Sequence, residues 1–179
     1  MRLFIAIDLP DKAKETIDKI KLELKGLKGI KPVATENIHL TLKFLGEVSD
    51  YRAQGIIEAL AQVKFKPFKI AISKMGVFPN EQKAQVLWID AEPAEPLMDI
   101  KKQIDAALPR FKDDHPFKNH ITFVRIKYVS TDADKKKILD ILKKPVEKTE
   151  FMVNKFRLYK SDLQPSGPTY DVLSEFGST

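Results

Sequence analysis

Two short stretches of this sequence share one pattern of residues that could do acid–base chemistry. Residues 39–42 read HLTL and residues 120–123 read HITF, so each stretch has a histidine, an apolar residue, a threonine and another apolar residue. An imidazole with an ordinary pKa near 6.5 exists in both its neutral and its protonated form at neutral pH. One imidazole can therefore act as a general base while the other acts as a general acid.

Such a pair suits the cleavage of a phosphodiester. One histidine would remove a proton from the attacking oxygen, and the other would protonate the departing oxygen. The hydroxyls of Thr41 and Thr122 could hold the non-bridging phosphate oxygens between them. The pattern therefore predicts His39 and His120 as catalytic residues in a reaction that needs no metal ion.

Strand alternation predicts which side chains lie beside each histidine. Alternate residues of a strand share one face, so His39, Thr41 and Lys43 are expected on a polar face, with Phe44 in the core. Lys43 could then meet a phosphate, although solvated strand lysines are common. Arg125 stands three residues after Thr122, and strict alternation sends it to the opposite face unless a β-bulge intervenes.

Metal binding is the competing use of paired histidines. A catalytic zinc site usually has three protein ligands, and neither motif has a second histidine or a carboxylate on the same strand face. The third histidine, His115, lies in the stretch DDHP and is expected in an exposed loop. The chain has no cysteine, no GxSxG turn and no Gly-rich phosphate loop. We therefore expect no metal and no cofactor.

The elements that would carry the two motifs can be read twice along the chain. Strand, helix, strand, helix, strand runs over residues 1–78 and again over 84–160, followed by a tail at 161–179. Strands are expected near residues 3–7, 38–44, 67–77, 86–89, 120–124, 151–159 and 170–176, and helices near 11–25, 50–63, 95–108 and 131–143. We predict one bilobal α+β domain over residues 1–179. It has two pseudo-twofold-related antiparallel-sheet lobes, helices on their outer faces and a central cleft.

Composition limits the setting of this chemistry. The 179 residues carry a net charge of +6, which permits a polyanionic partner such as RNA or is simply a lysine-rich solvated surface. The absence of cysteine suits a reducing compartment. The opening apolar run is too short for a signal peptide, and no stretch approaches the roughly 20 apolar residues that cross a bilayer. We expect a cytoplasmic protein with no membrane contact and no obligate protein partner.

Further stretches extend the two motifs into a pattern that covers nearly the whole chain. They are RLFIAI at 2–7, NIHLTLKFLGE at 37–47, VFP at 77–79, Trp88-Ile89, Arg125 behind the second motif, and SDLQPSGPTY at 161–170. Together they resemble the two-histidine phosphoesterases, and within them the RNA 2',3'-cyclic phosphodiesterases, also called 2'-5' RNA ligases. One departure is Asn119, where that family often has proline.

The resemblance implies specific roles. It makes His39 the proton donor and His120 the proton acceptor, with Arg125 as a further substrate-binding residue. It implies cleavage of RNA 2',3'-cyclic phosphate ends, including those of tRNA fragments, to 2'-phosphates. The same histidines could catalyse the reverse joining of RNA halves.

Two readings of the remaining features stay open. A catalytically silent RNA-binding module would not need two matched histidines, and no RNP1-like run is present. The aromatic residues Phe78, Trp88 and Tyr159 could stack on a base or belong to the core.

Overall fold

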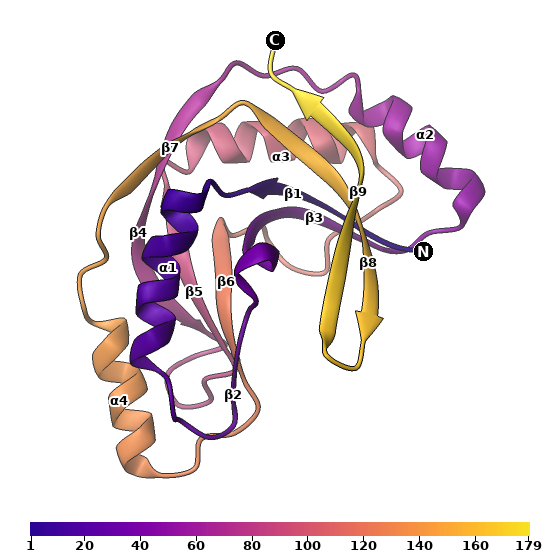
Figure 1. Ribbon diagram of the computed structural model, residues 1–179. Coiled ribbons are helices and arrows are strands. Elements are labelled where there is room, and N and C mark those ends of the chain that lie inside the picture. Colours follow the sequence, from indigo (N-terminus) through magenta and orange to yellow (C-terminus); the bar gives the residue numbers. More distant parts are fainter.

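A computed structural model describes residues 1–179 and shows one curled antiparallel sheet with helices packed along it (Figure 1). The strands are β1 (Arg2–Asp8), β2 (Ile30–Pro32), β3 (His39–Glu47), β4 (Phe68–Phe78), β5 (Val86–Glu92), β6 (His120–Ile126), β7 (Thr149–Val153), β8 (Lys155–Gln164) and β9 (Gly167–Gly177). The helices are α1 (Asp11–Glu23), the 3-10 helix η1 (Thr35–Asn37), α2 (Asp50–Leu60), α3 (Glu95–Ala107) and α4 (Asp132–Leu142). The predicted α+β class with an antiparallel sheet is confirmed.

The sheet has two halves that meet at the strands carrying the histidine motifs. Its order is β7-β4-β5-β6-β3-β1-β8-β9, with β2 paired to β6. We call β3, β1, β8 and β9 the His39 half, and β6, β5, β4, β7 and β2 the His120 half. The halves are joined by a single residue pair, Leu40 with Ile121. The strands therefore form one continuous sheet, and its division into two lobes stays a prediction.

The two sequence copies are interleaved in this sheet. Helix α1 from the first copy packs against β6 and β7 of the His120 half, whereas α3 from the second copy packs against β3. Strand β4 likewise pairs with β5 and β7, and β8 pairs with β1. Neither half is made by one copy alone, so the two motif strands are held in one framework.

One apolar core fixes that framework. A cluster of 37 buried apolar residues spans both halves, with the helices covering the same side of the sheet. Ile17 and Ile20 of α1 and Ile100 and Ile104 of α3 supply it at helical spacing. The opposite face of the sheet is left for polar and aromatic side chains. None of the helices combines the length and apolar character needed to cross a bilayer.

The structure corrects one predicted strand and adds two elements. The sequence predicts one strand over residues 151–159, but the chain turns at Asn154 between β7, which pairs with β4, and β8, which pairs with β1. One straight strand cannot pair with both partners, because they lie in different halves of the sheet. Strand β2 and helix η1 are not predicted, since three residues are too few to display a periodicity.

Candidate active site

His39 opens strand β3, and backbone geometry orients its imidazole. Nδ1 lies 2.7 Å from the backbone carbonyl oxygen of Asn37, and Nε2 lies 2.9 Å from Oγ1 of Thr41. A carbonyl oxygen can only accept, so Nδ1–H is the donor. Nε2 is therefore the acceptor in the neutral imidazole, and the Thr41 hydroxyl donates to it.

His120 opens β6 in the same way. Its Nδ1–H donates to the backbone carbonyl oxygen of Lys118 at 2.8 Å. This carbonyl stands two residues before the histidine, as Asn37 stands before His39, so the two motifs repeat the same local hydrogen bond. Nε2 of His120 has no protein partner and is available to a substrate or to water.

The register of β3 and β6 brings the motifs together. Leu40 pairs with Ile121, and both side chains are fully buried in the core. The residues on either side of this pair point to the opposite face, where antiparallel pairing places His39 near Thr122 and Thr41 near His120. Diagonal neighbours in an antiparallel pair are roughly 7–8 Å apart, which leaves room for a phosphate between the imidazoles. The predicted common face of His39 and Thr41 is confirmed.

Aromatic rings surround the imidazole of His39. Phe4 of β1 lies 5.0 Å from it between ring centroids, and Tyr170 of β9 meets it edge-on at 5.5 Å and 85°. Tyr159 of β8 stacks on the far side of Phe4 at 5.1 Å. Tyr159, a candidate for stacking on a base, is 8% exposed and belongs to this aromatic cluster.

Burial lowers the pKa of both histidines. The pKa of His39 falls to about 4, mainly because its charged form would lose solvent, with further lowering by the positive charge of Arg125. The hydrogen bond to Asn37 and the charge of Asp8 act in the opposite direction. The pKa of His120 is also lowered, first by burial and then by Lys118 and Arg125.

A β-bulge in β3 reverses the expected positions of Lys43 and Phe44. Thr41 pairs with Ala6 and Lys43 pairs with Ile5, so Leu42 is an extra residue and the alternation shifts by one. The predictions that Lys43 shares the face of His39 and that Phe44 is in the core are therefore wrong. Phe44 is 62% exposed, and its ring lies 6.2 Å from that of Phe4 on the histidine face.

Lys43 instead completes an ionic cluster on the helix side of the sheet, in which the two lysines are buried and the two aspartates are partly exposed. Its Nζ lies 2.7 Å from Asp105 of α3 and 3.1 Å from Asp113, which also pair with the buried Lys101. Its side chain is 1% exposed. Because the sheet separates this ammonium group from the histidine face, Lys43 is not placed to bind a phosphate between His39 and His120.

A matching bulge in β6 brings Arg125 to the site. Thr122 pairs with Trp88 and Arg125 pairs with Val86, so Phe123 is the extra residue. Val86 and Trp88 share one face of β5, and Arg125 consequently lies on the face that carries His120. Strict alternation places Arg125 on the opposite face, and the bulge is the physical reason that it does not lie there.

Aromatic and acidic side chains border His120. Phe78 meets the imidazole edge-on at 5.1 Å, and Nζ of Lys118 lies 3.9 Å from the ring centroid of Trp88. Trp88 is buried, but it lies on the histidine face beneath Phe78 and Lys118 and is not part of the apolar core cluster. Asp90 of β5 stands opposite His120 in the strand register, and its buried Oδ1 has no hydrogen-bond partner. Burial raises the pKa of this carboxyl group.

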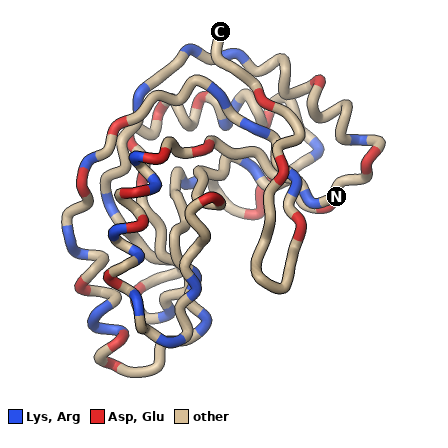
Figure 2. Tube along the Cα trace, in the orientation of Figure 1, with Lys and Arg blue, Asp and Glu red and all other residues tan.

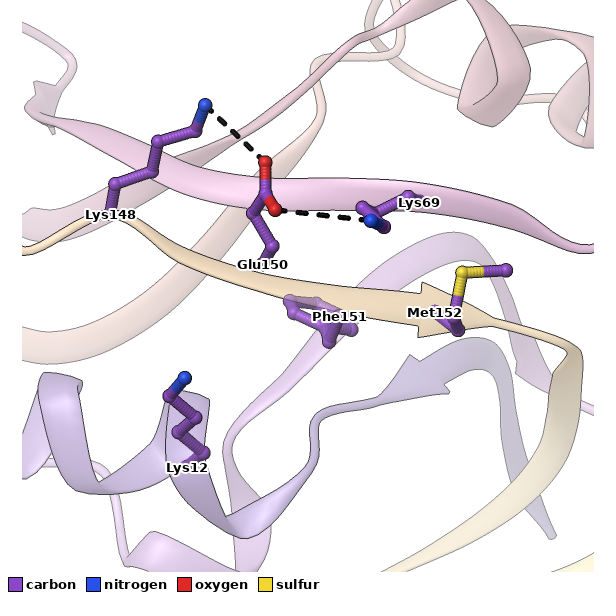
Figure 3. A pocket seen from close by; sticks show the side chains of 6 residues that line it. All are labelled: Lys12, Lys69, Lys148, Glu150, Phe151 and Met152. Atoms are coloured by element: carbon purple, nitrogen blue, oxygen red, sulfur yellow. Dashed lines mark ion pairs between the residues drawn. The ribbon is translucent and has the colours of Figure 1, made fainter.

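Other groups lie away from this face. His115 is in an exposed loop, as predicted. No three His, Asp or Glu side chains are grouped closely enough to hold a metal ion. A hollow at the edge strand β7 is lined by three lysines and lies on elements that carry neither motif (Figure 3). Its lining residues are Lys12, Lys69, Lys148, Glu150, Phe151 and Met152.

Three residues of the site are not singled out by the sequence. Asn37 and Tyr170 lie in the stretches that carry the family resemblance, but their residue types do not predict the hydrogen bond from Nδ1 of His39 to the Asn37 carbonyl or the contact of the Tyr170 ring with His39. Phe44 is expected in the core because an apolar residue at an alternate strand position is usually buried. The bulge that exposes it has no marker in the residue types around it.

A model of the family described as LigT like phosphoesterase matches the chain twice in succession, at residues 7–88 and 89–170. The two matches have equal length, and each contains one of the histidine motifs. This is the same doubling that the sequence displays in its order of strands and helices.

Relatives and solved structures agree with that match. An RNA 2',3'-cyclic phosphodiesterase of Methanocaldococcus jannaschii is 39% identical over 98% of this chain and all of its own. The crystal structure of TT0787 of Thermus thermophilus covers 99% of this chain and 97% of its own, at 29% identity and a TM-score of 0.83. The match to the crystal structure of E. coli LigT complexed with 3'-AMP covers 99% of this chain and 98% of that chain, at 26% identity and a TM-score of 0.81. The chain therefore belongs to the family of LigT like phosphoesterases.

Proposed function

We propose that this protein hydrolyses the 2',3'-cyclic phosphate at the end of an RNA chain, with His39 as proton donor and His120 as proton acceptor. The observation that carries the proposal is the pair of imidazoles on one face of the sheet. In each of them Nδ1 is held by a backbone carbonyl, and Nε2 lies against the Thr41 hydroxyl in His39 and has no protein partner in His120. The names of the relatives support this choice of substrate, because they are called RNA 2',3'-cyclic phosphodiesterases over nearly the full length of the chain.

The proposed reaction is an in-line displacement at phosphorus. Nε2 of His120 removes a proton from water, and the water oxygen bonds to phosphorus opposite the departing oxygen. The bond between phosphorus and the ribose 3' oxygen breaks, and Nε2 of His39 donates a proton to that oxygen. The product is a 2'-phosphomonoester with a free 3'-hydroxyl. One proton then moves from His120 back to His39 through solvent.

Substrate binding supplies the protonation state that this reaction needs. With a pKa of about 4, His39 is neutral in the free protein at neutral pH. An anionic phosphate beside the imidazole favours its charged form, and it also offsets the positive charge of Arg125, which otherwise lowers that pKa. Binding therefore raises the pKa of His39 and charges the donor only when a phosphate is present.

Three further side chains would hold the phosphate. The Thr41 and Thr122 hydroxyls lie on the histidine face and can donate to its non-bridging oxygens. The guanidinium of Arg125 can bind two of these oxygens at once and offset the charge that develops in the transition state. These groups act without a metal ion, so metal independence is part of the proposal.

Phe44 offers a platform for the terminal nucleobase. Its exposed ring lies on the histidine face beside Phe4, in the His39 half of the sheet where the leaving oxygen would sit. Single-stranded RNA is commonly recognised by aromatic side chains that stack on splayed bases. The ribose would then lie between Phe44 and His39.

The test uses a short RNA that ends in a 2',3'-cyclic phosphate. The proposal expects its conversion to a 2'-phosphomonoester, identified by phosphorus NMR against 2'- and 3'-phosphate standards, with no conversion by a His39→Ala, His120→Ala double variant. A pure 3'-phosphate would contradict the assignment of the leaving oxygen. An unchanged substrate would contradict the proposed activity, and joined RNA in the presence of a 5'-hydroxyl strand would assign ligation instead.

A further inference from the structure

The β8–β9 hairpin is attached to the first histidine motif by a contact that the proposed chemistry does not use. Nδ2 of Asn37 donates to the backbone carbonyl oxygen of Pro168 at 2.8 Å, near the tip of the hairpin. The backbone carbonyl of the same Asn37 accepts the hydrogen bond from Nδ1 of His39. One residue thus links the hairpin and the imidazole.

Asn37 is itself held in place. It ends the short helix η1, in which Oγ1 of Thr35 donates to Asp18 of α1 at 2.8 Å. Nζ of Lys21, also on α1, donates to the carbonyl oxygen of Val33 at 2.8 Å just before η1. The segment that holds the hairpin through the Asn37–Pro168 hydrogen bond is therefore attached to helix α1 of the core.

The hairpin carries Tyr170 onto His39. Tyr170 pairs with Ser161 of β8, and its ring meets both His39 and Phe4 edge-on, the latter at 4.9 Å between centroids. The imidazole thus has Phe4 on one side and Tyr170 on another. The Tyr170 hydroxyl makes no hydrogen bond in the structure, so the contacts with His39 are made by the ring.

The tip of the hairpin reaches toward the other half of the sheet. A side chain at Gly167 would come within 3.9 Å of Nζ of Lys31, and Lys31 lies on β2 opposite Arg125 of β6. Figure 1 shows the hairpin projecting beyond the rest of the sheet, and Figure 2 shows that its tip carries no charged residue. The tip of the hairpin therefore borders the histidine face without adding charge to it, whereas Arg157 at the base of β8 pairs with Asp8 at 3.2 Å.

We infer that Tyr170 and Asn37 are positioning residues for the proton donor. Asn37 fixes the hairpin, and the hairpin places the Tyr170 ring where it blocks rotation of the His39 imidazole and keeps water from it. Nε2 then stays directed at the leaving oxygen. The inference rests on the proposed function for its consequence in catalysis, but the positioning itself can be measured without substrate.

The charged groups that face His39 define what the Tyr170 ring contributes. Asp8 on β1 raises the pKa of His39, whereas Arg125 on β6 and Lys14 on α1 lower it, and burial lowers it most. The ring is part of that burial and carries no charge of its own at neutral pH. Removing it admits water, so the pKa of His39 rises toward its ordinary value near 6.5.

The test compares Tyr170→Ala, Tyr170→Phe and Asn37→Ala in the full chain. The pKa of His39 is followed by proton NMR, with its signal assigned by its loss in His39→Ala, and kcat and KM are measured on the cyclic-phosphate RNA. Tyr170→Ala is expected to raise the pKa of His39 by about one unit or more and to lower kcat about tenfold, because the donor is misplaced. Tyr170→Phe, which keeps the ring, is expected to leave the pKa of His39 and kcat at their wild-type values.

Asn37→Ala leaves the backbone carbonyl and removes only the hydrogen bond to Pro168. It is expected to raise the pKa of His39 and to lower kcat, each by less than Tyr170→Ala does. The control is Tyr51→Ala on α2, whose tyrosine is 79% exposed and far from the motifs in the fold. Unchanged pKa and kcat in Tyr170→Ala and Asn37→Ala would overturn the inference. If Tyr170→Phe were as impaired as Tyr170→Ala, the inference would also be overturned, because the Tyr170 hydroxyl rather than the ring would then position His39. If wild-type protein leaves the RNA unchanged, the proposed function fails while the pKa measurement still tests the positioning.

Discussion

Each of the two histidines is expected to be indispensable, because neither has a neighbour that could replace its Nε2. Replacing His39 or His120 by alanine should lower kcat by about 10² to 10⁴, the range expected for loss of a general acid or base. The double variant should be little worse than either single variant, because the pair acts as a unit. His115→Ala, in an exposed loop, is the matched control. A single variant with near wild-type kcat would contradict the two-histidine mechanism.

The lowered pKa values of these residues predict an unusual pH dependence. The proposed reaction needs protonated His39 and neutral His120. In the free protein His39 loses its proton above a pKa of about 4, and His120 gains one only below a pKa that is itself under 6.5. The fraction in the required state is therefore greatest between these two values.

Consequently kcat/KM, which reports the free protein, should reach its maximum below pH 6.5. Bound phosphate raises the pKa of His39, so the maximum of kcat should lie at higher pH than that of kcat/KM. Steady-state kinetics across pH 4 to 9 checks both statements. A maximum of kcat/KM above pH 7 would show that burial does not control the donor.

At the scale of elements, the bulges in β3 and β6 decide which side chains reach the site. The alternation of residues correctly predicts that His39 and Thr41 share a face. The alternation fails beyond each motif threonine, because each bulge adds one residue to its strand. As a result Phe44 and Arg125 lie on the histidine face, and Lys43 in β3 and Val124 in β6 lie on the helix side. A bulge is a property of strand pairing, and the residue types in either strand do not mark it.

Local geometry leaves a signal in the sequence, whereas long-range pairing leaves none. The helices and most strands follow from the spacing of buried residues such as Ile17 and Ile20, because periodicity reflects local geometry. The interleaving of the two sequence copies does not, since it depends on which strands pair across the chain. The contact of Tyr170 with His39 and the hydrogen bond from Asn37 to Pro168 have the same long-range origin.

The position of Lys43 leads to a prediction that separates a structural role from a binding role. Lys43→Met leaves two aspartates with one fewer cation, and the free energy of unfolding should fall by about 1–3 kcal/mol. Because the site face is unchanged, kcat/KM should stay within about twofold of wild type, the size of effect expected away from the site. Urea unfolding and steady-state kinetics check the two effects. The control is Lys69→Met, an exposed lysine at the outer hollow.

A higher KM with unchanged stability would be the opposite outcome, and it would return Lys43 to the substrate-binding residues. Such a result would require the β3 bulge to be absent in solution, since only regular alternation places Lys43 on the histidine face.

At the scale of the whole molecule, charge and catalysis are expected to respond to different solution conditions. The chain carries a net charge of +6, and Figure 2 shows lysines and arginines over both halves of the sheet. Affinity for longer RNA should therefore fall as salt rises, because phosphate contacts release counterions. Hydrolysis at saturating substrate should persist after exhaustive EDTA treatment. Activity lost in chelator and restored by zinc or manganese would contradict the proton-transfer mechanism.

The proposed roles of His39 as the acid and His120 as the base can be separated with a substrate that needs no acid. The substrate is a cyclic-phosphate RNA end in which sulfur replaces the 3' bridging oxygen. A thiolate leaves without being protonated, so this substrate has no need of a general acid. His39→Ala should hydrolyse it at a rate within about tenfold of wild type, whereas His120→Ala should stay slower by about 10² to 10⁴. Rescue of His120→Ala in place of His39→Ala, or rescue of neither, would contradict these two roles.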